Sequence, residues 1–380
     1  MATGFKLAAQ KEFQDLEKRG TWRLIDSQNV NSPNKPLPLK WVFTYKYDTN
    51  GYLDRFKARI CVRGDLQPFN NQDNYAATLA AKVFRSLMAI TAVFDLEAVQ
   101  LDAINAFVNG TLDEEVYTYM PDGFRIPGKV LHLVRALYGL RRSPLIWLQE
   151  FSRTLKSLGL TQIPESQCLY TNGRILLFFY VDDVVILYHR SHQSEFQRLK
   201  DGLLSTYAFK DLGALKWFLG IRIIRDRELK KLWLCQDSYI KKMAKTYNLD
   251  QGASFKTPLS TQEFEPNSGQ ATPQEVHSYQ SRIGSTTYPT TITRPDAAYA
   301  SNKLAQYLLN PSPLHIAAAD RVIRYLDDTR YLAIEYSQSA GLSQVTPDFE
   351  CCTDAAYADD IPSRKSTEGY LFKLFKGAIN

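Results

Sequence analysis

The segment LLFFYVDDVVILY, residues 176–188, decides how this sequence folds. It is almost wholly aliphatic or aromatic, which is typical of a strand, yet Asp182 and Asp183 stand side by side in its middle. The two charges divide the run and predict a hairpin with both carboxylates at its tip. Taken alone, this pattern favours a structural turn, because Asp tolerates unusual backbone angles and caps local amides. The alternative is a metal site at the tip.

The composition is that of a folded globular protein. The chain has 380 residues, of which 44% are hydrophobic and 12% aromatic, enough for two or three domains. The net charge of +6 is compatible with a polyanionic partner but does not establish one. Five scattered cysteines without a CxxC pair indicate reduced thiols in an intracellular protein. We expect a soluble protein with no signal peptide, transmembrane segment or membrane partner, because the N-terminus is charged and 176–188 is too short to span a bilayer.

Residues 40–64 are predicted to form a second β-hairpin. Two β-rich runs meet at Asn50–Gly51, a strong signal for a type I′ turn. On the return strand Arg55, Lys57 and Arg59 stand at alternate positions, so all three should project from one face. A solvated strand face is the usual outcome of such a pattern, and a functional basic surface is the alternative.

The rest of the chain mixes helical and strand patterns. A third hairpin is expected over 214–236, and a polar stretch at 250–278, rich in Ser, Thr, Gln and Pro, is interpreted as a linker. From 279 to 329 the pattern is helical, and strands return near the end. Further helices are expected near 5–16, 83–94, 144–160, 193–207 and 237–249.

A metal site at the tip of 176–188 needs a carboxylate from another strand. Mg²⁺ takes oxygen ligands, few of them from protein, because substrate phosphates complete its octahedron. Two such ions about 3.5–4 Å apart can activate an attacking oxygen and stabilise a leaving one. Asp102 is the best third ligand, since it also ends an apolar strand and stands 80 residues before Asp182. Alone, Asp102 is equally well explained as an ordinary strand-end residue.

Several motifs together resemble one known family. Tyr180-Val181-Asp182-Asp183 is similar to the Tyr-x-Asp-Asp box of reverse transcriptases. Other segments resemble successive blocks of copia-type LTR retrotransposon polyproteins, in the expected order and over about 7–370: QLDAINAFVNGTLDEEVYTYMPDGF, LVRALYGLRRSPLIW, FKDLGALKWFLGIRI, KTPL, ITRPDAAYASNKLAQYLLNPSPLH and RVIRYLDDT. A lone Tyr-x-Asp-Asp is weak evidence, but the ordered set is specific.

The resemblance implies an α+β, right-hand polymerase with fingers, palm and a helical thumb or connection region. The implied activity is RNA-directed DNA polymerisation, with dNTPs, an RNA template, and a DNA or RNA primer as partners. Asp102, Asp182 and Asp183 would hold two Mg²⁺ ions, for which Mn²⁺ could substitute. Of the hairpin pair, Asp183 would bind metal less directly. Other retrotransposon proteins are further candidate partners.

The same resemblance suggests residues around the substrates. Lys57 and Arg59 would grip the triphosphate, and Phe107, five residues after Asp102, would exclude a ribose 2′-hydroxyl. Tyr138 and Gly139 would line the nucleotide pocket. Leu219 and Gly220, in WFLGIRI, would steady the primer end. Without the family resemblance, Lys57 and Arg59 would be interpreted as part of a solvated strand face and Phe107 as a core aromatic residue. Leu219 and Gly220 would be ordinary strand and turn residues.

The resemblance also predicts the domain limits. These are an N-terminal helix and connector (1–39), fingers and palm (40–249), a linker (250–278), a thumb or connection region (279–330) and a truncated ribonuclease H-like segment (331–380). Asp354 matches the first metal-binding aspartate of that segment, but Ala356 and Tyr357 stand where the family usually has Asp and Trp. The later acidic residues are absent before Asn380, so we expect no ribonuclease H activity.

Other departures leave a second hypothesis open. Ala81 stands where the family often has Pro, and Leu145 where an Arg is frequent. The chain therefore also fits a degenerate, non-catalytic fragment with residual nucleic-acid binding, excised from a longer polyprotein. A third possibility is another palm-type nucleotidyl transferase, which the ordered motifs argue against. By the lack of signals and by the family, the expected location is the cytoplasm, extended to a virus-like particle or the nucleus.

Overall fold

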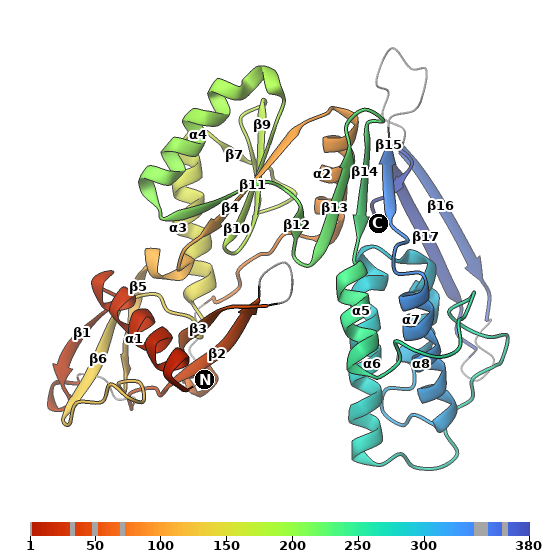
Figure 1. Cartoon of the computed structure of the whole chain (residues 1–380), viewed down its shortest axis with the longest axis horizontal. Helices are drawn as coiled ribbons and strands as arrows, with labels where there is room; N and C mark the ends of the chain where they lie inside the picture. The colour runs from red at the N-terminus through yellow and green to blue at the C-terminus, as the bar shows by residue number, and fades with distance from the viewer. Residues whose placement is uncertain (1, 31–34, 48–51, 69–72, 338–348, 359–363) are drawn as a thin grey trace. The chain divides into compact units, whose positions relative to one another are not determined.

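The computed structural model describes residues 2–30, 35–47, 52–68, 73–337, 349–358 and 364–380 (Figure 1). The chain divides into two compact units. The first comprises Met1–Leu79, Gln100–Ile186 and His192–Gly213, and the second comprises Ala80–Val99, Leu187–Ser191 and Ala214–Asn380. The expected turn at Asn50–Gly51 lies outside the described residues.

The first unit begins with helix α1 (Ala2–Lys18), which packs on a hairpin of strands β2 (Leu39–Tyr47) and β3 (Leu53–Val62). Thr44 pairs with Lys57, and Val42 pairs with Arg59. Because directly opposite residues of an antiparallel pair share a face, the basic side chains of β3 lie on one face, as predicted. The other face carries aromatic residues that meet Phe5 of α1, including Phe43 at 5.0 Å between ring centroids.

The larger sheet of the first unit has six strands in the order β11-β4-β10-β9-β8-β7, and the quoted hairpin forms its two central strands (Figure 1). β9 (Ile175–Tyr180) and β10 (Asp183–Tyr188) are almost fully buried apart from their tip. Helix α3 (Ser143–Ser157) packs on β9 through Phe151 and Phe179, whose rings lie 4.9 Å apart. The other elements are β4 (Glu97–Ala103), β7 (Thr161–Gln162), β8 (Leu169–Thr171), β11 (Phe209–Ala214) and α4 (Gln193–Thr206).

A three-stranded sheet completes the first unit, in the order β1-β6-β5. Its strands are β1 (Trp22–Asp26), β6 (Lys129–Arg135) and β5 (Thr111–Thr118). It shares one hydrophobic cluster with α1 and with the β2–β3 hairpin, here called the basic hairpin, and this cluster is centred on the fully buried Leu16, Ile60 and Leu131. This common core fixes the basic hairpin to the body of the unit. Short 3₁₀ helices lie at Ser27–Asn29, Gly64–Leu66 and Ala106–Asn109.

The second unit contains a four-stranded sheet in the order β12-β13-β14-β15, with α2 (Ala81–Val93) against β14 and β15. The strands are β12 (Trp217–Phe218), β13 (Ile221–Asp226), β14 (Lys231–Cys235) and β15 (Ile334–Ser337). A smaller sheet consists of β16 (Phe349–Ala356), β17 (Thr367–Leu374) and β18 (Gly377–Ala378). Short 3₁₀ helices lie at Arg190–His192 and Pro295–Ala297.

Four helices pack together in the second unit (Figure 1). They are α5 (Asp237–Thr246), α6 (Pro273–Ile292), α7 (Ala298–Ala305) and α8 (Pro313–Asp328). Thr272 and Ser312 cap α6 and α8, each with Pro in the first helical turn, so both helices start where local chemistry favours it. Phe264, from the stretch interpreted as a linker, is buried in this helical core. The predicted domain limits stay a prediction.

Candidate active site

The tip of the β9–β10 hairpin is a two-residue loop, Val181–Asp182. Val181 has φ 57, a left-handed conformation that is a genuine outlier for a β-branched residue. The indole Nε1–H of Trp147, in α3, donates a hydrogen bond to the Val181 carbonyl oxygen at 2.7 Å. Trp147 is buried, with 1% of its surface exposed, so it is held by the core. The acidic tip therefore has a strained backbone, which the buried side chain of Trp147 holds in place.

Strand β4 brings Asp102 beside this tip. The Ala103 N–H donates a hydrogen bond to the Asp182 carbonyl oxygen at 2.8 Å, which joins the two segments at their ends. Burial and the Asp182 charge raise the pKa of Asp102, while Lys57, Lys210 and Arg59 act in the opposite direction. Two acidic side chains and three basic ones thus share one electrostatic environment.

Asp183 is held by a neighbouring strand. The Gln100 Nε2 amide donates to its Oδ1 at 3.0 Å. Burial raises the pKa of Asp183, the Gln100 hydrogen bond lowers it, and the charges of Asp182 and Asp102 raise it further. Asp102, Asp182 and Asp183 are therefore near enough to repel one another. Within the described residues, however, no three His, Cys, Asp or Glu side chains are arranged closely enough to hold a metal ion as they stand.

Three residues predicted for nucleotide binding, Arg59, Tyr138 and Phe107, pack against one another and are here called the aromatic stack. The Arg59 guanidinium lies 4.2 Å from the centroid of the Tyr138 ring. Phe107 meets the same ring edge-on, at 4.8 Å and 65°. Burial raises the pKa of Tyr138 to about 12. Lys57 lies on the same strand face as Arg59, two residues away.

The backbone at position 139 requires a glycine. Its φ is 95, and a Cβ placed there would stand 2.1 Å from the Val62 carbonyl oxygen. The Val62 N–H also donates to the Tyr138 carbonyl oxygen at 2.7 Å. Any larger residue at 139 would push the loop off the end of β3. Gly139 therefore holds Tyr138 against the strand that carries Arg59.

The remaining predicted residues belong to the second unit. Leu219 and Gly220 form the loop between β12 and β13, both with positive φ, 50 and 78. Asp354 lies on β16 opposite Gly369 and is exposed.

Sequence reasoning missed three residues of the first unit: Gln100, Trp147 and Lys210. Gln100 stands two positions before Asp102, so strand alternation could have placed both on one face. Lys210 follows Phe209 on the edge strand β11, in a segment that was not expected to be a strand. The role of Trp147 had no local signal, because its partner is 34 residues away.

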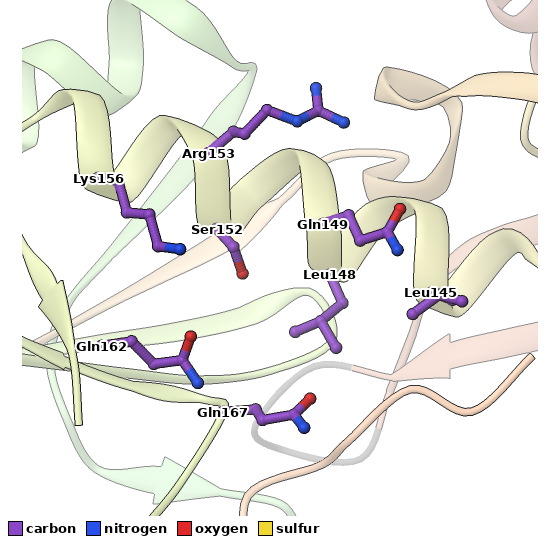
Figure 2. Close-up of a pocket in the computed structure, with 8 residues that line it drawn as sticks. All are labelled: Leu145, Leu148, Gln149, Ser152, Arg153, Lys156, Gln162 and Gln167. Carbon is purple, nitrogen blue, oxygen red and sulfur yellow. The ribbon is translucent and has the colours of Figure 1, made fainter. Parts of the chain in front are cut away.

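The outer face of α3 lines a separate pocket (Figure 2). Its volume is about 400 Å³, and Figure 2 shows Leu148 and Ser152 pointing from α3 toward the side that carries Gln162 and Gln167. The lining residues are Leu145, Leu148, Gln149, Ser152, Arg153, Lys156, Gln162 and Gln167. None of the predicted site residues borders it. Leu145, one of the departures from the family pattern, thus changes this pocket and not the acidic tip.

The architecture defines the class of protein first. Over 99% of its length the chain is similar to a solved foamy viral protease–reverse transcriptase, covering 55% of that chain with a TM-score of 0.52 and 15% identity. That structure is of a complex with double-stranded DNA. At this identity the likeness concerns the fold alone, and it confirms the predicted α+β polymerase fold.

The family follows from the sequence. Residues 19–261 match the family model described as reverse transcriptase (RNA-dependent DNA polymerase), and the chain belongs to that family. It is 33% identical, over 98% of its length, to the retrovirus-related Pol polyprotein from transposon TNT 1-94 of Nicotiana tabacum, covering 28% of that polyprotein. It is 31% identical, over 72% of its length, to the transposon Ty5-1 protein of Saccharomyces cerevisiae, covering 89% of it.

These relatives confirm the resemblance to copia-type LTR retrotransposons. A retrovirus-related Pol polyprotein from transposon RE1 of Arabidopsis thaliana is 29% identical over 88% of the chain, which covers 23% of that relative. The chain thus spans about a quarter of the length of the two plant polyproteins. Reverse transcriptases generally use divalent metal ions. None of the helices in the described ranges is both long and apolar enough to cross a membrane.

Proposed function

We propose that this chain is an RNA-directed DNA polymerase that adds deoxynucleotides to a primer 3′-hydroxyl on an RNA template. The observation that carries the proposal is that Asp102 lies beside the strained tip that holds Asp182 and Asp183. The hydrogen bond from the Ala103 N–H to the Asp182 carbonyl oxygen joins the two segments. An ordinary hairpin needs no half-buried acidic neighbour, and its left-handed turn position is usually taken by Gly or Asn and not by Val.

The donor set fits divalent metal ions in kind. Asp102, Asp182 and Asp183 offer hard oxygen donors, and Mg²⁺ or Mn²⁺ needs few of these from protein when substrate phosphates supply the rest. Two such ions would activate the primer hydroxyl and neutralise charge on the triphosphate. The raised pKa values of Asp102 and Asp183 express burial and mutual repulsion, which added positive charge would relieve.

The basic strand face and the aromatic stack fit a deoxynucleoside triphosphate. Lys57 and Arg59 present cations toward the acidic tip, where both act on Asp102. Arg59 is oriented by the ring of Tyr138, which favours a fixed, fork-shaped contact with phosphate oxygens. Phe107, packed edge-on against the same ring, would stand as a rigid barrier to a 2′-hydroxyl.

Other parts of the proposal concern partners and location. A DNA or RNA primer would meet the Leu219–Gly220 turn, and other retrotransposon proteins are candidate partners. The expected locations are the cytoplasm, a virus-like particle or the nucleus. For the C-terminal segment we propose no ribonuclease H activity, because Ala356 and Tyr357 stand where the family usually has Asp and Trp.

The test is incorporation of dTTP on poly(rA) primed with oligo(dT), with Mg²⁺ or Mn²⁺. A double Asp182→Asn/Asp183→Asn variant should lose essentially all metal-dependent extension. Asp201→Asn, an exposed carboxylate on α4, is the matched control and should extend like the parent. A folded parent that does not extend primers would favour the degenerate-fragment hypothesis, which the substitutions at Ala81 and Leu145 support.

A further inference from the structure

The β12–β13 turn has an unusual backbone. Phe218 pairs with Ile221, so Leu219 and Gly220 alone make the loop. Both have positive φ, 50 and 78, which is the pattern of a mirror-image hairpin turn. Gly adopts this geometry freely, but for Leu it costs roughly 1–2 kcal/mol. A Leu in this position indicates that contacts outside the turn hold it there.

The outside contact comes from helix α6. The Tyr288 hydroxyl donates a hydrogen bond to the Leu219 carbonyl oxygen. The Tyr288 ring packs edge-on against Tyr239 of α5, with centroids 5.0 Å apart at 81°. This edge-to-face contact limits where the Tyr288 ring can lie.

The position of Tyr239 has its own cause. Pro289 lies inside α6 and has no N–H, so the Ser285 carbonyl oxygen has no helical donor four residues later. The Tyr239 hydroxyl donates to that oxygen at 3.0 Å. The proline thus creates the acceptor that fixes Tyr239, Tyr239 packs against Tyr288, and Tyr288 holds the turn.

The other contacts of this hairpin involve residues that flank the loop. Phe218 is stacked on Phe84 of α2, with centroids 4.9 Å apart. The Arg222 guanidinium forms an ion pair with the Asp237 carboxylate at 3.0 Å. On the hairpin, however, Arg222 pairs with Trp217, one position further from the loop than the Phe218–Ile221 pair. A cavity of about 450 Å³ borders the hairpin and is lined in part by Trp217 and Arg222. The Tyr288 hydrogen bond, in contrast, acts on the backbone of the loop itself.

We propose that Tyr288 is a positioning residue, through which the helices of the second unit fix the Leu219–Gly220 turn and so the primer end. This inference rests on the proposed polymerase function. Tyr288 acts through the turn backbone and need not touch a substrate. Removing its hydroxyl should leave the helices folded and loosen the turn.

The test compares Tyr288→Phe with Tyr247→Phe. The Tyr247 hydroxyl also bonds α6, at 2.8 Å from Ser281 Oγ and 3.0 Å from Ser285 Oγ, whereas the hydroxyl on the Leu219 carbonyl oxygen is that of Tyr288, so Tyr247 is the matched control. In Tyr288→Phe, amide hydrogen exchange of residues 219–222 should accelerate, and the single-turnover rate of the first nucleotide addition should fall about tenfold. The dissociation constant for template–primer and the melting temperature should stay close to those of the control.

The outcomes are distinguishable. If the parent extends primers and the two variants have equal rates and equal exchange, the inference is overturned while the polymerase function stands. If exchange accelerates but the rate does not fall, Tyr288 holds the turn without positioning the primer, which also overturns it. A parent that extends no primer overturns the proposed function together with this inference.

Discussion

Replacing Trp147 by Phe tests whether the acidic tip depends on one hydrogen bond. The substitution removes the indole N–H that donates to the Val181 carbonyl oxygen and keeps an aromatic ring in the core. Leaving that carbonyl without its partner costs about 1–3 kcal/mol. The left-handed backbone at Val181 costs about 1–2 kcal/mol by itself. Because the two magnitudes are similar, losing the hydrogen bond should let the turn relax.

The smaller ring also leaves space in the core, so we expect a total loss of about 2–4 kcal/mol in unfolding free energy. A relaxed turn displaces Asp182, and a displacement of about 1 Å can reduce a rate about 100-fold. Urea unfolding followed by circular dichroism measures the stability. Initial rates of dTTP incorporation on poly(rA)·oligo(dT), taken where each variant is folded, measure the activity.

Phe151→Leu is the matched control. Phe151 is fully buried one helical turn after Trp147, and their rings stack at 5.0 Å, but it makes no hydrogen bond to the tip. We expect it to lose stability with a rate near that of the parent. Equal rates in the two variants, per folded molecule, would refute the claim that Trp147 positions the carboxylates.

Three further predictions concern other contacts. Phe107→Ala should reduce the preference for dTTP over UTP about tenfold or more, measured as a ratio of kcat/KM values, and an unchanged ratio would rule out a steric barrier. Arg59→Lys should raise KM for dTTP about tenfold with little change in melting temperature, because an ammonium cannot reproduce the planar contact with Tyr138; an unchanged KM would contradict the triphosphate role. Asp296→Ala should cost about 3–5 kcal/mol in urea unfolding, since it leaves the fully buried Arg294 uncompensated. Burial raises the pKa of Asp296, but hydrogen bonds from Arg294 and Tyr325 hold it below its ordinary value. The stability from Asp296 is therefore present above the ordinary carboxyl pKa and is lost as pH falls through the lower folded value. In acid the parent should lose that stability and Asp296→Ala should not, and parallel pH profiles would contradict this assignment.

Local patterns were enough to predict much of the fold. The apolar flanks of Asp182 and Asp183 predicted the central hairpin, and alternation in β3 predicted the shared face of Lys57 and Arg59. Asp102 was expected from its place at the end of an apolar strand, and its nearness to Asp182 agrees with that reasoning. The hairpin and the shared strand face depend on spacing of about two to ten residues, which a sequence displays directly, whereas the pairing of Asp102 with Asp182 spans 80 residues and was expected from the family resemblance.

Features that depend on distant partners could not be predicted. β11 (Phe209–Ala214) is polar and contains a Gly, and it is a strand because it pairs with the edge of β4. Phe264 is a lone aromatic in a polar stretch, and only the packed helices around it make it a core residue. The hydrogen bonds from Trp147 to Val181 and from Tyr288 to Leu219 join residues 34 and 69 positions apart. Composition and periodicity carry no signal for such pairs.

The central claim is that Asp102 acts with the hairpin carboxylates in one metal-dependent centre. The most direct measurement is the single-turnover rate of dTTP addition on an RNA template by Asp102→Asn, with Mn²⁺ binding measured on the same protein and Asp201→Asn as control. We predict a loss of at least about 1000-fold in rate, weaker Mn²⁺ binding and an unchanged fold in Asp102→Asn alone. A rate and Mn²⁺ affinity equal to those of the control would contradict the account.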